Sequence, residues 1–338
     1  MVGPGSVWCA PRTGASGIDT LENAEVALAT QATVPEEVAR EGAYVRDQNA
    51  APPPLARRTV RGDLAQIVAD FLKSEDLIYQ LTLRDIRVRY KQAALGFAWA
   101  LLLPAAVVMA GIVIRYAVAY SSGRGLQSAQ LAGMAVKAVP WAFFVGCLNT
   151  ATPSLVSNKS LVTKIYFPRE VLPLSAVLAQ TFDSAIGLIL VAMIVPFFGV
   201  TLSLQLLWVP VLLGLLWLIS LGAGLFLACA NLFFRDVKYL VQVFVTFGIF
   251  ITPVILDISA YGPKLAPFMM LNPVSPILEG LALAVVGHQN LIDPFITRSG
   301  FHTWHPWYLA YSAAWAFGGL VLSALFFHRS ERRFAEIV

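Results

Sequence analysis

The stretch that decides the fold is Arg84–Pro104, RDIRVRYKQAALGFAWALLLP, in which a basic cluster runs directly into a long apolar segment. The cluster consists of Arg84, Arg87, Arg89 and Lys91. Because charged side chains enter hydrocarbon only at a large free-energy cost, the cluster marks a membrane surface. Loops rich in Lys and Arg beside a membrane span stay in the cytoplasm. We therefore expect a first transmembrane helix that runs from the cytoplasm outward.

The composition points to an integral membrane protein. Of the 338 residues, 57% are hydrophobic and 13% are charged, whereas a soluble domain carries about 25% charged residues. Cys9, Cys147 and Cys229 are far apart and show no paired spacing, so we expect neither a disulfide framework nor a thiolate metal site.

Three regions follow one another along the chain. Residues 1–60 are rich in Ala, Gly, Pro and acidic side chains and contain no signal-peptide core, so we expect a disordered cytoplasmic extension. Residues 61–92 form an amphipathic helix and a basic junction, with Asp63 and Gln66 spaced as in a capping box. Its position just before a span favours the membrane interface over a soluble partner. Residues 93–338 form the transmembrane domain. The apolar face of the amphipathic helix within residues 61–92 consists of Leu64, Ile67, Val68, Phe71 and Leu72.

Six apolar segments are long enough to cross the hydrocarbon, which takes about 20 residues of helix. They lie near residues 95–119, 138–157, 172–198, 204–231, 237–257 and 307–328. With the N-terminus inside, twelve basic residues flank the cytoplasmic ends of these segments. Only four flank the outer ends, namely Arg124, Lys137, Lys264 and Arg298. This bias favours six spans with both termini in the cytoplasm.

The region between the fifth and sixth spans does not fit a simple external loop. Leu265–Leu271 and Pro276–Val286 are apolar but too short to cross a membrane. Trp304, Trp307 and Tyr308 indicate an aromatic belt at the outer surface. The predicted fold class is therefore an all-α integral membrane protein with six transmembrane helices. An N-terminal amphipathic interface helix precedes the spans, and short external re-entrant helices lie between spans five and six.

Four motifs carry a family resemblance. They are Arg89–Gln92 with Leu95–Pro104, Lys164–Pro173, Asn231–Val237 and Leu271–Glu279. Together they resemble the type-2 ABC exporter permeases, in particular the branch that exports O-antigen, capsule, teichoic-acid and cell-wall galactan polymers. The resemblance implies a homodimer that works with two ATPase subunits in the bacterial inner membrane and exports a polyprenyl-diphosphate-linked polysaccharide. It covers roughly residues 64–338 and assigns no role to residues 1–60.

The loop between the second and third predicted spans is a candidate contact for a cytosolic partner. Pro168 would end any helix there, and a short helix bounded in this way could transmit force. The resemblance implies that the partner is an ABC ATPase subunit, whereas an ordinary basic loop that sets the topology is the alternative. Glu170 is expected to compensate the charge of Arg169 rather than to form a gating salt bridge. The candidate residues are Asn158, Lys159, Lys164, Tyr166, Pro168, Arg169 and Glu170.

Two further sets of side chains are candidates for contact with substrate. The basic cluster could attract an anionic lipid or a pyrophosphate headgroup, with topology determination as the alternative. Aromatic side chains could line a conduit, because sugars stack on aromatic faces, with packing in the core or against lipid as the alternative. The conduit candidates are Trp99, Tyr116, Tyr120, Phe244, Phe247 and Phe250.

Polar residues at membrane depth are candidates by default. These intramembrane polar residues are Asn149, Asp183 and Glu279. We expect Asp183 to pair with a Ser or Thr hydroxyl in the bundle interior and Glu279 to have access to water. Arg115 is expected to snorkel toward the outer surface.

Several function classes are excluded or disfavoured. The chain contains no Gly-x-x-x-x-Gly-Lys-Ser/Thr motif, so we expect no catalytic residue and no cofactor here, with ATP and Mg²⁺ on a partner ATPase. His302 and His305 lack a third ligand, and no metal site is expected.

The expected partners are the ATPase, a second copy of the chain, a lipid-linked glycan and membrane lipid, but no nucleic acid. An exporter of a small hydrophobic drug or lipid is the closest rival. A membrane glycan enzyme is disfavoured because the acidic residues are few and scattered.

Overall fold

The computed structural model describes residues 62, 69, 71–91, 98–122, 128–164, 167–201, 203–296 and 302–337, all in the unit Thr59–Val338. Residues 1–60, predicted to be a disordered extension, lie outside the described residues, as do Asp63, Gln66 and most of the predicted apolar face. The described part is mainly helical, as predicted. It begins with α4 (Glu75–Tyr90) and α5 (Ala98–Ser122).

Four of the described helical stretches are long and apolar enough to cross a membrane. They are Ser128–Ala151, Val171–Phe198, Leu204–Phe233 and Pro306–Glu331. They correspond to α6 (Ser128–Ala151), α9 (Val171–Ile194) with η1 (Val195–Phe198), η2 (Leu204–Leu207) with α10 (Trp208–Phe233), and most of α14 (Pro306–Ile337). Two shorter apolar helices, Ala105–Ala117 within α5 and α11 (Val237–Ile251), stand where the first and fifth spans were predicted.

The second predicted span was placed wrongly along the sequence. We predicted residues 138–157, whereas α6 begins at Ser128 and ends at Ala151, with Pro140 inside the helix. The prediction failed because Lys137 was taken as a flanking residue, although it belongs to the helix interior. After α6 the chain turns and forms α7 (Ser154–Ser157) and α8 (Lys159–Lys164).

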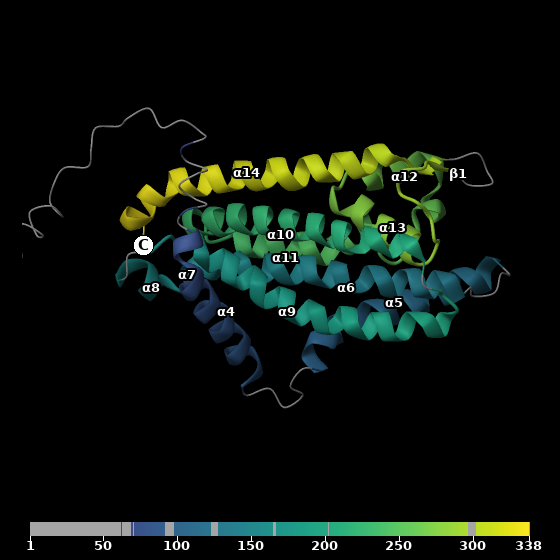
Figure 1. Cartoon of the computed structure of the whole chain (residues 1–338), viewed down its shortest axis with the longest axis horizontal. Helices are drawn as coiled ribbons and strands as arrows, with labels where there is room; N and C mark the ends of the chain where they lie inside the picture. The colour runs from purple at the N-terminus through teal and green to yellow at the C-terminus, as the bar shows by residue number, and fades with distance from the viewer. Residues whose placement is uncertain are drawn as a thin grey trace, which may run out of the picture. The chain divides into compact units, whose positions relative to one another are not determined.

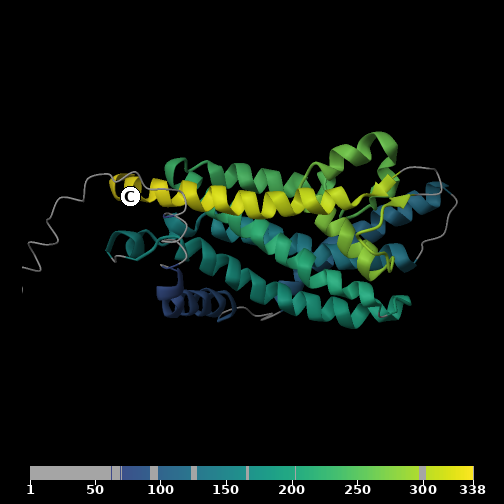
Figure 2. The ribbon, with the colours of Figure 1, turned by 45° about the horizontal axis from the view of Figure 1, so that its top comes forward.

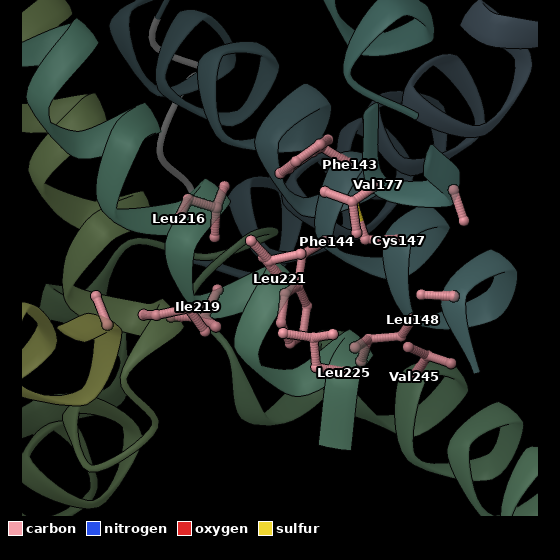
Figure 3. Packing of buried hydrophobic residues seen from close by; sticks show 14 of the residues in the cluster. Phe143, Phe144, Cys147, Leu148, Val177, Leu216, Ile219, Leu221, Leu225 and Val245 are labelled. Atoms are coloured by element: carbon pink, nitrogen blue, oxygen red, sulfur yellow. The ribbon is translucent and has the colours of Figure 1, made fainter. Parts of the chain in front are cut away.

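The core lies around α10, which packs against α14, α6, α9 and α13 (Val274–Val285) and runs between α14 and α6 (Figure 1). Side chains of α6, α9 and α10 interlock at its centre, among them Phe144, Val177 and Leu221 (Figure 3). Gly222 allows a close approach to α14, because a Cβ atom there would lie 3.0 Å from the Cα atom of Leu320. Small residues at helix contacts serve this purpose in membrane proteins.

Between α11 and α14 the chain folds into short elements. They are η3 (Ile258–Tyr261), α12 (Gly262–Met270), α13, β1 (Phe295–Ile296) and β2 (His302–Trp304). The two strands pair antiparallel, a departure from the all-α prediction, since strands of two and three residues leave no alternating pattern in the sequence. These elements lie at the opposite end of α10 from α7 and α8 (Figures 1 and 2). We call the two ends of the bundle the α12 end and the α8 end.

Candidate functional site

The basic cluster of α4 is divided between paired and exposed side chains. Arg89 forms an ion pair with Asp183 on α9, and its Nη1 also donates to Gln180 Oε1 at 3.1 Å. The Tyr90 hydroxyl donates to Asp183 Oδ1 at 2.5 Å. Burial raises the pKa of Tyr90, although the adjacent Arg89 lowers it, so the phenol remains a donor at neutral pH. Arg87 is exposed.

Asp183 therefore has partners other than those predicted. We expected a Ser or Thr hydroxyl, but the buried carboxylate binds a guanidinium and a phenol from α4, 93 and 94 residues earlier in the chain. Of the four candidates for a headgroup contact, Arg87 and Lys91 are exposed, whereas Arg84 and Arg89 have partners within the described chain.

Arg84 connects α4 to the loop that was predicted to contact a cytosolic partner. Its Nη2 atom lies 2.8 Å from Asp85 Oδ1 and donates to Asn158 Oδ1 at 3.0 Å. Asn158 stands between α7 and α8 and also donates from its side chain to the carbonyl of Ser154 at 2.9 Å. The short helices thus form where a force-transmitting segment was expected, and α4 is attached to them. The side chain of Lys164 and all of Tyr166 lie outside the described residues, whereas Lys159 is exposed and Pro168 is half-buried.

The pair Arg169 and Glu170 was expected to compensate charge locally, but both side chains contact α14 instead. The Arg169 backbone N–H donates to Glu331 Oε1 at 3.4 Å, and Arg169 Nη1 donates to the Glu331 carbonyl at 2.9 Å. Glu170 Oε1 lies 3.5 Å from His328 Nδ1. The start of α9 is therefore held against the end of α14 by polar contacts.

A network of four charged side chains occupies the α12 end. Lys137 Nζ lies 3.0 Å from Asp257 Oδ1 and 3.3 Å from Glu279 Oε2. Arg115 Nη2 lies 3.1 Å from Asp257 Oδ2, and Arg115 Nε donates to the carbonyl of Ile255 at 2.9 Å. The network joins α5, α6, α13 and the turn after α11, so it fixes four separate segments to one another.

Two predictions about these residues are wrong. Lys137 is not an outer flank but is fully buried, with 0% of its surface exposed. Arg115 is buried beside Asp257 rather than extended toward the surface. Glu279, expected to have access to water, is 5% exposed and lines a pocket. The network could have been suspected from the sequence, because Lys137 is a lone lysine inside an otherwise apolar segment and such a residue requires a buried partner. Asp257, which stands just after an apolar helix, was not recognised as that partner.

A pocket of about 260 Å³ opens beside this network. Its lining includes both carboxylates, Asp257 and Glu279, together with Gln130, Ser259 and Phe295. The polar side chains at this end therefore border a space as well as an ion-pair network.

The aromatic conduit candidates are exposed on the described surface. Phe244, Phe247 and Phe250 are 57–61% exposed and follow one face of α11, since residues three apart are neighbours on a helix. Tyr116 and Tyr120 are exposed on α5, whereas the side chain of Trp99 lies outside the described part. Asn149 is exposed on α6. These faces are available to lipid, to a second chain or to a substrate.

Comparison with known proteins identifies the family. The ABC-2 type transporter family matches residues 76–285, more than half of the chain. The O-antigen export system permease protein RfbA of Klebsiella pneumoniae is 24% identical over 272 residues, which cover 78% of this chain and 95% of that protein. Its namesake in Myxococcus xanthus is 24% identical over 228 residues, which cover 67% of this chain and 86% of that protein. The apolar helices and these matches together show that the chain is a membrane transport subunit and belongs to the ABC-2 type transporter family.

Proposed function

We propose that the chain is the permease subunit of an ATP-driven exporter that moves a polyprenyl-diphosphate-linked polysaccharide from the cytoplasm to the outer face of the inner membrane. The observation that carries this proposal is the similarity to O-antigen export permeases, which extends over 78% of the chain and 95% of one such relative. The match is nearly end to end in that relative.

In this proposal six helices cross a bacterial inner membrane, with α5 and α11 as the first and fifth spans. The α8 end and both termini lie in the cytoplasm. The charge bias supports this orientation, because the burial of Lys137 within α6 leaves only Arg124, Lys264 and Arg298 at the outer flanks. The helices α12 and α13 act as re-entrant segments at the outer mouth. Residues 1–60 form a cytoplasmic extension, residues 61–92 an interface helix with its basic junction, and residues 93–338 the permease domain.

The energy for transport comes from a separate ABC ATPase, which carries ATP and Mg²⁺. The segment Asn158–Glu170 receives the motion of this partner, since it follows α6 and α7, includes the short helix α8 and makes polar contacts with α4 at Asn158 and with α14 at Arg169. Arg84 transmits movement at Asn158 to α4. Arg169 transmits it to α14 through the Glu331 carbonyl.

Two copies of the chain enclose the path of the polymer. Six helices surround too little space for a glycan, whereas a homodimer can form a conduit at its interface. The exposed aromatic faces of α5 and α11 supply sites for sugar stacking, and the exposed Arg87 and Lys91 supply positive charge for the pyrophosphate headgroup. Arg84 and Arg89 hold α4 in position beside them.

The proposal is tested by reconstituting the purified chain with its ATPase in lipid vesicles. A lipid-linked glycan should stimulate ATP hydrolysis, and Phe247→Ala should reduce glycan transport without lowering thermal stability, because Phe247 is 61% exposed. Phe226→Ala on α10, which removes another exposed phenylalanine, is the matched control. Depletion of the protein in cells should cause lipid-linked glycan to accumulate in the cytoplasmic leaflet. Stimulation by a small hydrophobic drug but not by the glycan would instead favour the rival exporter, and loss of all ATPase association would overturn both.

A further inference from the structure

A group of potential metal ligands lies at the α8 end, and the function proposed above does not require it to bind an ion. Glu170 immediately precedes α9, whereas His328 and Glu331 lie on one face of α14, three residues apart. One ligand atom from each side chain, an imidazole nitrogen or a carboxylate oxygen, lies within 4.8 Å of the other two. The fold thus brings together residues that are 158 positions apart in the chain.

Glu170 supplies the observation that points to a ligand. Its side chain is only 4% exposed, and its Oε1 atom is buried without a hydrogen bond to any described residue. The same oxygen is directed toward the cluster, since His328 Nδ1 lies 3.5 Å from it. A buried carboxylate oxygen without a hydrogen bond or a counter-ion is energetically costly.

The charges around the cluster do not remove this cost. Glu170 and Glu331 bring two carboxylates together, and Arg169 is a cation beside them. The Arg169 guanidinium contacts the Glu331 carbonyl, at 2.9 Å, and the ring of Phe334, 5.7 Å from its centroid. Its backbone N–H binds Glu331 Oε1 at 3.4 Å. With a neutral imidazole, these four side chains carry two carboxylate charges against one guanidinium, and this excess of negative charge favours a divalent cation.

We propose that Glu170, His328 and Glu331 bind a divalent transition-metal ion of the zinc class and so join the start of α9 to α14. Zn²⁺ takes imidazole and carboxylate ligands at about 2.0–2.2 Å, so ligand atoms around a tetrahedral ion stand about 3.4 Å apart. In the structure the ligand atoms lie within 4.8 Å of one another. Rotations about the side-chain bonds that move each ligand atom by roughly 1 Å would bring them to the separation expected around Zn²⁺. The imidazole selects against Mg²⁺, which prefers oxygen ligands in an octahedral arrangement.

The site is structural in this proposal and leaves one coordination position for water. The bound ion would hold Glu170, the last residue of the segment expected to contact the ATPase, against α14. Because the proposal concerns metal binding, its test is independent of whether the exported molecule is a polysaccharide.

The experiment uses the purified full-length chain in detergent, stripped of metal with a chelator and titrated with Zn²⁺. We expect one Zn²⁺ per chain and a higher melting temperature in its presence. His328→Gln and Glu331→Gln should each weaken binding at least about tenfold. His328→Cys should retain it, because a thiolate also binds Zn²⁺. His305→Gln, at an exposed histidine of the α12 end, is the matched control and should bind like the unchanged protein.

Three results would overturn the proposal. One is Zn²⁺ binding that is no tighter to the unchanged chain than to His328→Gln. Another is equal stabilisation by Mg²⁺, which would indicate attraction by the carboxylates alone. The third is that the metal-free protein gains the same stability when the pH is lowered to about 6, because a protonated His328 would then be the counter-ion of Glu170.

Discussion

The guanidinium of Arg89 on α4 is paired with the carboxylate of Asp183 on α9. Tyr90 and Gln180 complete the contact from the two helices. The pair is asymmetric, since the Asp183 side chain is 7% exposed and that of Arg89 is 31% exposed. It therefore ties the helix that lies before the first span to the interior of the bundle, rather than leaving Arg89 available to lipid.

Replacing Asp183 should detach the end of α4. Asp183→Asn keeps the shape but removes the charge, and we expect it to lower the free energy of unfolding by about 2 kcal/mol. This is less than the roughly 3–5 kcal/mol for a fully buried pair, because the remaining Arg89 reaches solvent. Chemical or thermal unfolding of the purified chain in detergent measures the change.

Arg87→Gln provides the control, because Arg87 is an exposed arginine on the same helix and should change stability by less than about 0.5 kcal/mol. Equal effects of the two substitutions would mean that the Arg89–Asp183 pair contributes nothing specific.

Removing the ammonium group of Lys137 should strongly destabilise the α12 end. Lys137→Met leaves Asp257 and Glu279 without their shared cation, and we expect a loss of about 3–5 kcal/mol in the free energy of unfolding. The double variant Lys137→Met with Glu279→Gln should recover part of the loss, because Arg115 still pairs with Asp257 and the second change removes the carboxylate left without a cation. Lys264→Met, at an exposed lysine of α12, is the control. A single variant as stable as the double variant would argue against the network.

The close contact between α10 and α14 predicts a contrast between two glycines of the same helix. Gly222→Ala should destabilise the chain by about 1–3 kcal/mol, because the new methyl group would meet backbone atoms of Leu320 at 3.0–3.1 Å. Gly214→Ala has nothing within 4 Å of its added Cβ atom and should be neutral or slightly stabilising. Melting temperatures of the two variants in the same detergent test this contrast. Similar losses at both positions would contradict it.

The hydrogen bond between Arg84 and Asn158 predicts an effect on energy coupling. Arg84→Gln in the reconstituted complex should lower the amount of substrate transported per ATP hydrolysed, while hydrolysis itself continues, because α4 no longer follows the α7–α8 turn. Asn158→Ala should act through the same contact, so the double variant should be no worse than the more severe single variant. Lys73→Gln, at an exposed residue just before α4, is the control. Additive losses in the double variant would mean that the two residues act separately.

Much of the fold could be read from local sequence. The apolar segments predicted the helices α5, α9, α10, α11 and α14 near their observed positions, because hydropathy is a property of each segment alone. The predicted start of α6 was wrong because hydropathy considers each segment alone and takes no account of distant partners. Lys137 is as polar as a flanking residue, and only its distant partners allow it to stand inside the helix.

The sequence by itself determined that this is a membrane protein, where its apolar helices lie and which family it resembles. Composition, charge bias and motifs are local properties of the sequence and do not depend on how the helices pack. Tertiary structure alone decided the partner of each charge. Arg89 meets Asp183 across 94 residues, Lys137 meets Glu279 across 142, and Glu170 approaches His328 across 158. An ion pair requires atoms within about 4 Å, and a distance of that kind depends on how helices pack rather than on how residues follow one another.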